Sequence, residues 1–238
     1  MISSLSQLRA KGRADLSGRW NEAAMFTFVY LIVMGFVSAL GSGLDSLVLG
    51  PRTLVYTSDI SYVNAVSESL SGVFGIILTL LALPIGWGYS VAFLGNHRAE
   101  SDDPFDVGNM FVGYHDFRRV TLTLILSAII QILFYCLLII PGFWMSLRLA
   151  LVQYILRDKP ELSGNQVLRL SAEMMYGYKW KLFLLMLTFI GWGILCIFTL
   201  GIGYFWLAPY IDQTMANFYE EVKADYQGRK GEETCACL

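Results

Sequence analysis

The stretch LIIPGFWMSLRLALVQYILRDKP, residues 138–160, decides how the chain is built. It is apolar enough for a lipid bilayer, yet Pro141 and Gly142 interrupt it near its start and Arg148 lies inside it. Proline removes a backbone donor and glycine permits a sharp turn, so the pair predicts a hairpin at a membrane surface. We therefore expect one helix to end here and a shorter one, over residues 143–156, to return.

The composition of the whole chain favours a membrane protein. Of 238 residues, 55% are hydrophobic and only 15% are charged, and the mean hydropathy is +0.54. A helix needs about 20 mostly apolar residues to cross the hydrocarbon core. The apolar runs predict an all-α, polytopic fold with six transmembrane helices, at about residues 23–44, 73–94, 120–140, 143–156, 182–199 and 202–222.

The basic residues predict how these helices are oriented. All 17 Lys and Arg residues except Arg52 and Arg148 fall on one side of the six helices. Because cytoplasmic flanks collect Lys and Arg, both termini are expected in the cytoplasm, with the helices in three hairpins. The result is a single membrane domain over residues 1–225, followed by a disordered cytoplasmic tail over residues 226–238.

A small motif introduces each predicted hairpin. A glycine with an aromatic residue after it occurs in LSGRW at 16–20, FVGYH at 111–115 and MYGYK at 175–179. The segments before the first and fifth helices are also amphipathic, since Leu5 and Leu8, or Val167 and Leu170, share one helical face. These segments either lie along the inner leaflet as interfacial helices or are ordinary cytoplasmic packing helices.

Arg148 is the sharpest candidate for a functional residue. An unpaired charge within the membrane costs at least about 2.5 kcal/mol, so Arg148 needs a partner, water or a route to the surface. The expected partner is Asp212, on the last helix. Amides on neighbouring helices extend the pair into a candidate polar pocket that contains Arg148, Asp212, Gln131, Gln153, Gln213 and Asn217.

Two interpretations of this polar set remain open. It either recognises an anionic headgroup or solute, with Arg148 as a forked donor and Asp212 as a proton or cation partner, or it is a structural salt bridge that joins helices. Helix breaks are predicted at Pro84, at Pro141 with Gly142, and at Pro209. Such breaks line binding sites in transporters, but they also occur as simple kinks.

Several functional classes are disfavoured. The net charge of −2 offers no footprint for nucleic acid. The sequence contains no phosphate-binding glycine loop, no G-x-S-x-G elbow and no H-E-x-x-H motif. We therefore expect no catalytic residue, no cofactor and no metal site, and the protein is not expected to be an enzyme.

Much of the chain resembles a known family. The features are the IIPG turn at 139–142, YIL-x-D-x-P at 154–160, LTFIGW at 187–192 and G-I-G-x-x-W-L-x-PY at 201–210, with LP-x-G at 83–86 upstream. Together they resemble the bacterial integral membrane family catalogued as domain of unknown function 975. The resemblance implies a multi-pass protein of the bacterial cytoplasmic membrane, with no agreed activity or catalytic residues.

The function expected from the sequence is a non-enzymatic membrane component that binds lipid or a partner protein. The alternative is a small carrier or permease component for an anionic solute or lipid, and an intramembrane enzyme comes third. The expected partners are membrane lipids, another membrane protein or a second copy of the chain.

Overall fold

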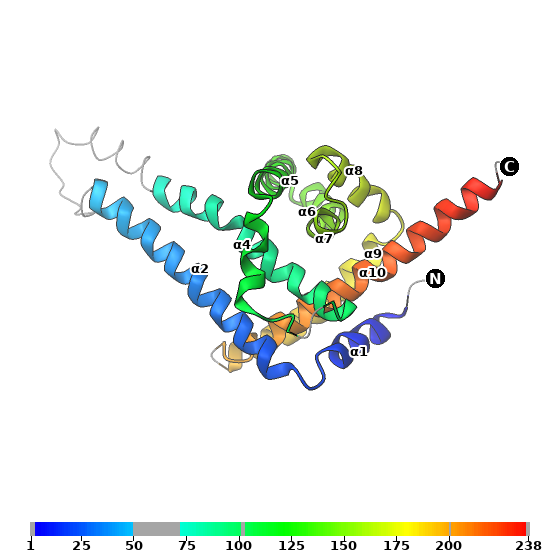
Figure 1. Ribbon diagram of the computed structural model, residues 1–238, viewed down its shortest axis with the longest axis horizontal. Coiled ribbons are helices and arrows are strands. Elements are labelled where there is room, and N and C mark those ends of the chain that lie inside the picture. The colour runs from blue at the N-terminus through cyan, green and yellow to red at the C-terminus, as the bar shows by residue number, and fades with distance from the viewer. Residues whose placement is uncertain (1–2, 50–71, 101–102, 200, 237–238) are drawn as a thin grey trace.

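The computed structural model describes residues 3–49, 72–100, 103–199 and 201–236, and within these ranges the chain forms helices and no strand. The elements are α1 (Leu5–Asp15), α2 (Trp20–Leu49), α4 (Val73–Arg98), the 3-10 helix η1 (Val107–Tyr114), α5 (Phe117–Leu137), α6 (Ile139–Leu149), α7 (Val152–Asp158), α8 (Gly164–Met174), α9 (Lys179–Phe198) and α10 (Tyr204–Ala236). In Figure 1, α5 and α6 are seen nearly end-on, whereas α2, α4 and α10 extend across the picture.

Four of the described helices, α2, α4, α5 and α9, are long and apolar enough to cross a membrane. The other two predicted crossings take a different form. The predicted 143–156 helix is split, because α6 ends at Leu149 and α7 begins at Val152. The last predicted crossing is part of α10, which is long but carries Asp212 and the acidic pair Glu220 and Glu221. Length and composition therefore support four candidate spans among the described residues.

The predicted hairpin turn lies slightly earlier than expected. The backbone leaves the helical conformation at Leu138 (φ −164°, ψ 140°), and Pro141 and Gly142 belong to the first turn of α6. Proline is tolerated there because the first helical amides have no partner within the helix. A Cβ on Gly142 would lie 2.6 Å from the Tyr135 ring, so this glycine lets α6 fold back closely onto α5.

Neither Pro84 nor Pro209 ends its helix, because both prolines lie inside continuous helices; the simple kinks that the sequence also allowed stay a prediction. The Tyr114 hydroxyl of η1 donates a 2.8 Å hydrogen bond to the Leu81 carbonyl, in the turn before Pro84. A Cβ on Gly88 would come 2.3 Å from the Met110 carbonyl oxygen. The small residues around Pro84 thus create a docking surface for η1 rather than a break.

The helices α2 and α4 lie side by side and extend to the upper left of Figure 1. A Cβ on Gly41 would be 2.6 Å from the Gly75 Cα, so the two backbones touch. The Asp45 carboxylate of α2 accepts the backbone amides of Phe74 (3.1 Å) and Gly75 (3.4 Å), and it therefore caps the start of α4 from the neighbouring helix. The residues that follow α2, with Arg52, lie outside the described ranges.

Two segments of the chain share one local design. Ser4 precedes α1 and Ser163 precedes α8, and the backbone amide of each donates a 2.8 Å hydrogen bond to the side chain of Gln7 or Gln166. Each box caps an 11-residue helix. Gly18 (φ 85°) and Gly177 (φ 86°) then make the left-handed turns that lead into α2 and α9.

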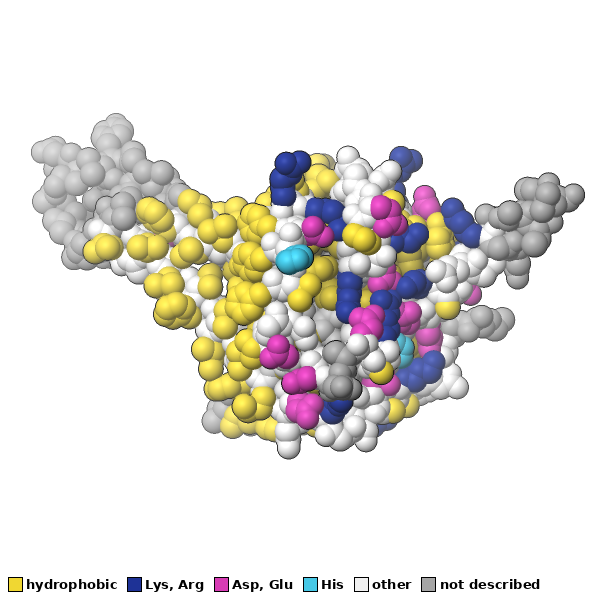
Figure 2. Space-filling model, viewed as in Figure 1, with side chains coloured by type: hydrophobic (Ala, Val, Ile, Leu, Met, Phe, Trp, Pro, Cys, Tyr) yellow, Lys and Arg dark blue, Asp and Glu magenta, His cyan; other side chains and the backbone are white. Residues whose placement is uncertain are grey.

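The amphipathic helices pack on the interior of the molecule. α1 packs on α10, η1 packs on α4, and α8 packs on α5, α6 and α7. Figure 2 shows apolar side chains over α2 and α4, whereas Lys, Arg, Asp and Glu gather on the other half of the visible face. This division is the one expected of a protein with one part in lipid and the other in water.

The end of the chain differs from the expected disordered tail over residues 226–238. α10 is helical to Ala236. Tyr226 explains part of this order, because its hydroxyl donates a 3.0 Å hydrogen bond to Glu173 of α8. Arg229 adds an ion pair of 3.0 Å with Asp225, one helical turn earlier.

Candidate functional site: a basic pocket beside Arg148

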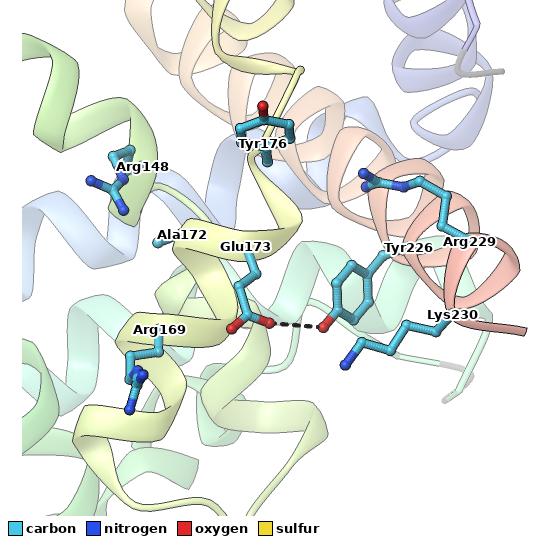
Figure 3. A pocket seen from close by; sticks show the side chains of 8 residues that line it. All are labelled: Arg148, Arg169, Ala172, Glu173, Tyr176, Tyr226, Arg229 and Lys230. Carbon is cyan, nitrogen blue, oxygen red and sulfur yellow. Dashed lines mark hydrogen bonds between the residues drawn. The ribbon is translucent and has the colours of Figure 1, made fainter. Parts of the chain in front are cut away.

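A pocket of about 500 Å³ opens between the end of α6, one face of α8 and the last turns of α10 (Figure 3). Four of its lining side chains are basic and one is acidic. Its lining consists of Arg148, Arg169, Ala172, Glu173, Tyr176, Tyr226, Arg229 and Lys230.

Arg148 stands in the last turn of α6, and its position is held from α8. The Ser171 hydroxyl donates a 2.8 Å hydrogen bond to the Arg148 carbonyl. The guanidinium Nε is buried and makes no hydrogen bond within the described part of the chain. The packing of α6 against α8 therefore fixes the root of the guanidinium, and Arg148 forms one wall of the pocket.

The acidic groups near the pocket already have partners. Glu173 accepts the Tyr226 hydroxyl at 3.0 Å, as the dashed line in Figure 3 shows. Asp225 accepts the Tyr178 hydroxyl at 2.6 Å, and this bond, with the nearby Arg229, holds the pKa of Asp225 below its ordinary value. Burial and the bond to Asp225 raise the pKa of Tyr178 to about 12. The pocket is therefore left with a surplus of positive charge.

Exposed aromatic side chains occur on α6 and in the segment that joins α8 to α9. Trp144 and Trp180 meet edge to face at 5.7 Å, and Lys179 lies 5.3 Å from the Trp144 ring centre. Trp180 is 62% exposed and Tyr176 is 74% exposed, although both are large and apolar. Exposed Trp and Tyr beside basic residues are typical of the level of lipid headgroups.

The predicted partner of Arg148 lies elsewhere. No ion pair between Arg148 and Asp212 occurs among the described residues; Asp212 instead interacts with Tyr89 of α4. The other members of the predicted pocket are also dispersed. Gln153 uses its backbone carbonyl to accept the Trp87 indole at 2.8 Å, and Gln131 lies on α5, partly buried, outside these contacts.

Gln213 and Asn217 belong to a second polar group, which joins α1 to α4 and α10. Gln213 accepts an amide hydrogen of Asn96 at 2.9 Å and donates to Asp15 at 3.3 Å and to the Asn217 side chain at 3.3 Å. His97 completes the group with a 2.8 Å contact to Asp15. Gln213 and Asn217 are fully buried, so they act as connectors between helices.

The densest ionic contacts were missed by sequence reasoning. Arg98 at the end of α4 makes two 2.7 Å hydrogen bonds to Asp158 at the end of α7. Asp158 also accepts Lys223 Nζ at 2.5 Å and the Tyr219 hydroxyl at 2.7 Å, both from α10, and Arg98 donates to Glu220 at 2.7 Å. We call these five residues, Arg98, Asp158, Tyr219, Glu220 and Lys223, the charged junction.

Burial alone would raise the pKa of Asp158, but the hydrogen bonds from Arg98, Lys223 and Tyr219 outweigh it and hold that pKa below its ordinary value. A sequence signal for the charged junction existed, because Arg98 and Asp158 each end an apolar run on the side predicted to be cytoplasmic. Helices that end at one level bring such residues together.

Comparison with known proteins adds a family and no activity. Residues 69–226 match the family described as protein of unknown function, DUF975. The chain belongs to this family. No curated protein and no solved structure matches the chain. The basic pocket is formed largely within the matched residues, but Arg229 and Lys230 lie beyond them.

Proposed function

We propose that this DUF975 protein is a multi-pass membrane component, without chemistry of its own, that binds the phosphate of an anionic lipid headgroup in the pocket beside Arg148. The basic lining of the pocket, with Arg148 on its α6 wall and Arg169 on its α8 wall, carries the proposal. Guanidinium forks match phosphate oxygens, so several basic side chains around one cavity favour a phosphate as the ligand.

The surroundings support a lipid as the source of the phosphate. The excess of basic residues favours an anionic ligand over a zwitterionic one. The exposed Tyr176 and Trp180 indicate the headgroup level, where a lipid can place its phosphate in the pocket while its chains stay in the bilayer. A free phosphate-bearing solute has the same chemistry and would favour the carrier alternative.

The test is native mass spectrometry of protein in nanodiscs that contain equal amounts of an anionic and a zwitterionic phospholipid. We expect the wild type to retain the anionic lipid, and Arg148→Leu to retain it about tenfold less, because a hydrogen bond to a charged group contributes about 1.5–3 kcal/mol. Arg148→Lys, which keeps the charge and loses the fork, should fall between them.

Arg118→Leu is the matched control. It also removes one positive charge, from an exposed position at the start of α5 outside this pocket. Equal lipid loss in both Leu variants would reject the pocket and leave only general charge attraction. Binding of inorganic phosphate to the detergent-purified protein, lost in Arg148→Leu without any preference among lipids, would identify a soluble ligand instead.

The proposal includes six crossings in the bacterial cytoplasmic membrane, with both ends in the cytoplasm. α6 with α7, and the first half of α10, would supply the two crossings beyond the four candidate spans. The distribution of basic residues supports this arrangement. In a variant that carries Cys136→Ser and Cys196→Ser, a membrane-impermeant maleimide should label the tail cysteines Cys235 and Cys237 in inside-out vesicles only. Labelling in right-side-out vesicles would contradict the topology.

A further inference from the structure

The 3-10 helix η1 carries apolar side chains on more than one of its faces. Its eight residues, Val107–Tyr114, contain no charged side chain. Met110 and Gly113 are buried against α4. Phe111 and Tyr114 are nevertheless exposed, although both side chains are large and aromatic. A segment that buries one apolar face and exposes another needs a second apolar surrounding besides the protein interior.

The geometry of the 3-10 helix explains why the exposed rings form a row. Three residues make one turn, so side chains at positions i and i+3 lie one above the other. Phe111 and Tyr114 accordingly stack with their ring centres 6.1 Å apart, and Phe117, in the first turn of α5, continues the row 5.8 Å from Tyr114. We call Phe111, Tyr114 and Phe117 the aromatic row. In an α-helix such side chains would lie about 60° apart around the axis, so the row depends on the 3-10 conformation.

The aromatic row adjoins an exposed apolar face of the candidate span α4. The Tyr114 hydroxyl donates a 2.8 Å hydrogen bond to the Leu81 carbonyl. Leu81 and Ile77, one helical turn apart, are both exposed and both lie within the candidate span. Leu81 is about 25 Å along the helix axis from Arg98, the last residue of α4, so this contact lies well inside the span. The medium that covers Ile77 and Leu81 therefore also covers the aromatic row.

The third face of η1 is polar. Asn109 and Val112, one turn apart on this face, line a hollow of about 240 Å³ together with Glu100 and Arg157, which form an ion pair there. Figure 2 shows the same division on the molecule, since apolar side chains continue from α2 and α4 to the middle of the visible face and charged side chains gather beyond them. The three faces of η1 thus meet the protein interior, an apolar medium and a polar hollow.

From these contacts we infer that η1 is embedded in one leaflet of the bilayer, with the aromatic row against lipid acyl chains. Tyr114 satisfies its hydroxyl within the protein, as a polar group in hydrocarbon must. The flanking residues fit a shallow position, because Asp106 precedes η1 and Arg118 follows the row, so both ends can reach the headgroup level. The connection between α4 and α5 is thus a membrane-contacting element. The inference does not depend on lipid binding at Arg148.

Electron paramagnetic resonance of nitroxide labels in nanodiscs tests the inference. In a background with all four cysteines replaced by serine, a single label site is introduced by Phe111→Cys, Val112→Cys or Ile77→Cys. The labels at positions 111 and 77 should both collide with oxygen, which concentrates in hydrocarbon, several-fold more often than with a water-soluble nickel chelate. Val112→Cys is the matched control, because Val112 is 51% exposed and Phe111 is 46% exposed, yet Val112 lies on the polar face. Its ratio of oxygen to nickel collisions should be several-fold lower.

Equal ratios at positions 111 and 112 would place η1 in water and overturn the inference. A label at position 111 that neither reagent reaches would show that protein, such as a second copy of the chain, covers the row, and would also overturn it. A second comparison needs no label. Phe111→Leu keeps the apolar contact, whereas Phe111→Asp places a charge in lipid, so only Phe111→Asp should lower the melting temperature in nanodiscs. Equal melting temperatures of the two variants would reject the lipid contact.

Discussion

The helix pairs α1–α2 and α8–α9 begin alike and end in different surroundings. Both start with a Ser and Gln capping box, and both turn at a left-handed glycine before a long apolar helix. They differ at corresponding positions of the short helix. Gly12 of α1 lies so close to α10 that a Cβ there would be 2.5 Å from the Thr214 hydroxyl, whereas Ser171 of α8 bonds to the Arg148 carbonyl.

As a consequence, α10 packs directly against α1, whereas a pocket remains between α10 and α8. α1 lies directly against α10, and a 2.5 Å ion pair between Lys11 and Glu221 holds its edge. α8 packs under α6 and leaves the basic pocket between itself and the end of α10. The local signals thus specify the same helix and turn twice, whereas the contacts of the two short helices differ.

Breaking the charged junction should cause the largest loss of stability. Asp158→Asn leaves Arg98 and Lys223 without their shared partner, and the Asp158 side chain is only 7% exposed. Breaking a buried pair from one side costs about 3–5 kcal/mol. Lys11→Met, which removes the exposed pair on the α1 side, should cost less than about 1 kcal/mol. Thermal unfolding in detergent can compare the two, and equal losses would contradict the contrast.

Acid should weaken the α7–α10 contact. The folded pKa of Asp158 is lower than its unfolded value of 3.8, so its contribution is fully present above that value and is lost as the pH falls below it. Unfolding measured from pH 6 downward should show a loss of stability in the wild type below about pH 4. A slope as steep in Asp158→Asn as in the wild type would assign the acid sensitivity to other carboxyl groups.

Substitutions at the contact residues of the two short helices should reduce the free energy of unfolding by an intermediate amount. Gly12→Leu places a side chain against Thr214 and should cost about 1–3 kcal/mol, because overpacking displaces the neighbouring helix. Ser171→Ala removes one hydrogen bond and should cost about 1 kcal/mol. Proteolysis of α1 in detergent gives a second measurement, since Gly12→Leu should release α1 and Ser171→Ala should not.

The two capping boxes should show small and equal effects on stability. Ser4→Ala and Ser163→Ala should each cost about 1 kcal/mol, and the two losses should be similar, because the local geometry is the same. Unfolding of the two variants under identical conditions checks this. A Ser163→Ala loss several times larger would show that α8 depends on its cap and α1 on its docking.

Much of the helical architecture follows from local signals. The apolar runs predicted α2, α4, α5 and α9, and the family resemblance is confirmed by the match over residues 69–226. Proline was a less reliable signal of where a helix ends. Pro84 removes one amide, but Tyr114 from η1 supplies a donor to the same region of α4, and the helix continues. A contact between distant segments thus offsets a local cost that is visible in the sequence.

The candidate site likewise depends on contacts between distant segments that local patterns do not predict. Arg148 was recognised as unusual, because a charge in an apolar run is visible in any sequence, but its pairing with Asp212 was inferred from depth along two helices. The depth of a residue along its helix does not determine the direction in which its side chain points. Successive residues of a helix point about 100° apart, so Asp212 faces tyrosines while the adjacent Gln213 faces Asp15. The partner of a buried charge depends on helix rotation and packing.

By itself, the sequence determined that this protein is helical and rich in apolar segments, that amphipathic segments precede the first and fifth apolar helices, and which family it belongs to. These properties depend on hydrophobic area, caps and turns, which act between neighbours in the chain. Only the tertiary structure decided that Arg148 lines a pocket with Arg169 and Glu173, and that Arg98, Asp158 and Lys223 meet at one junction. Those contacts depend on how helices rotate and cross when they pack, and no local pattern encodes that geometry.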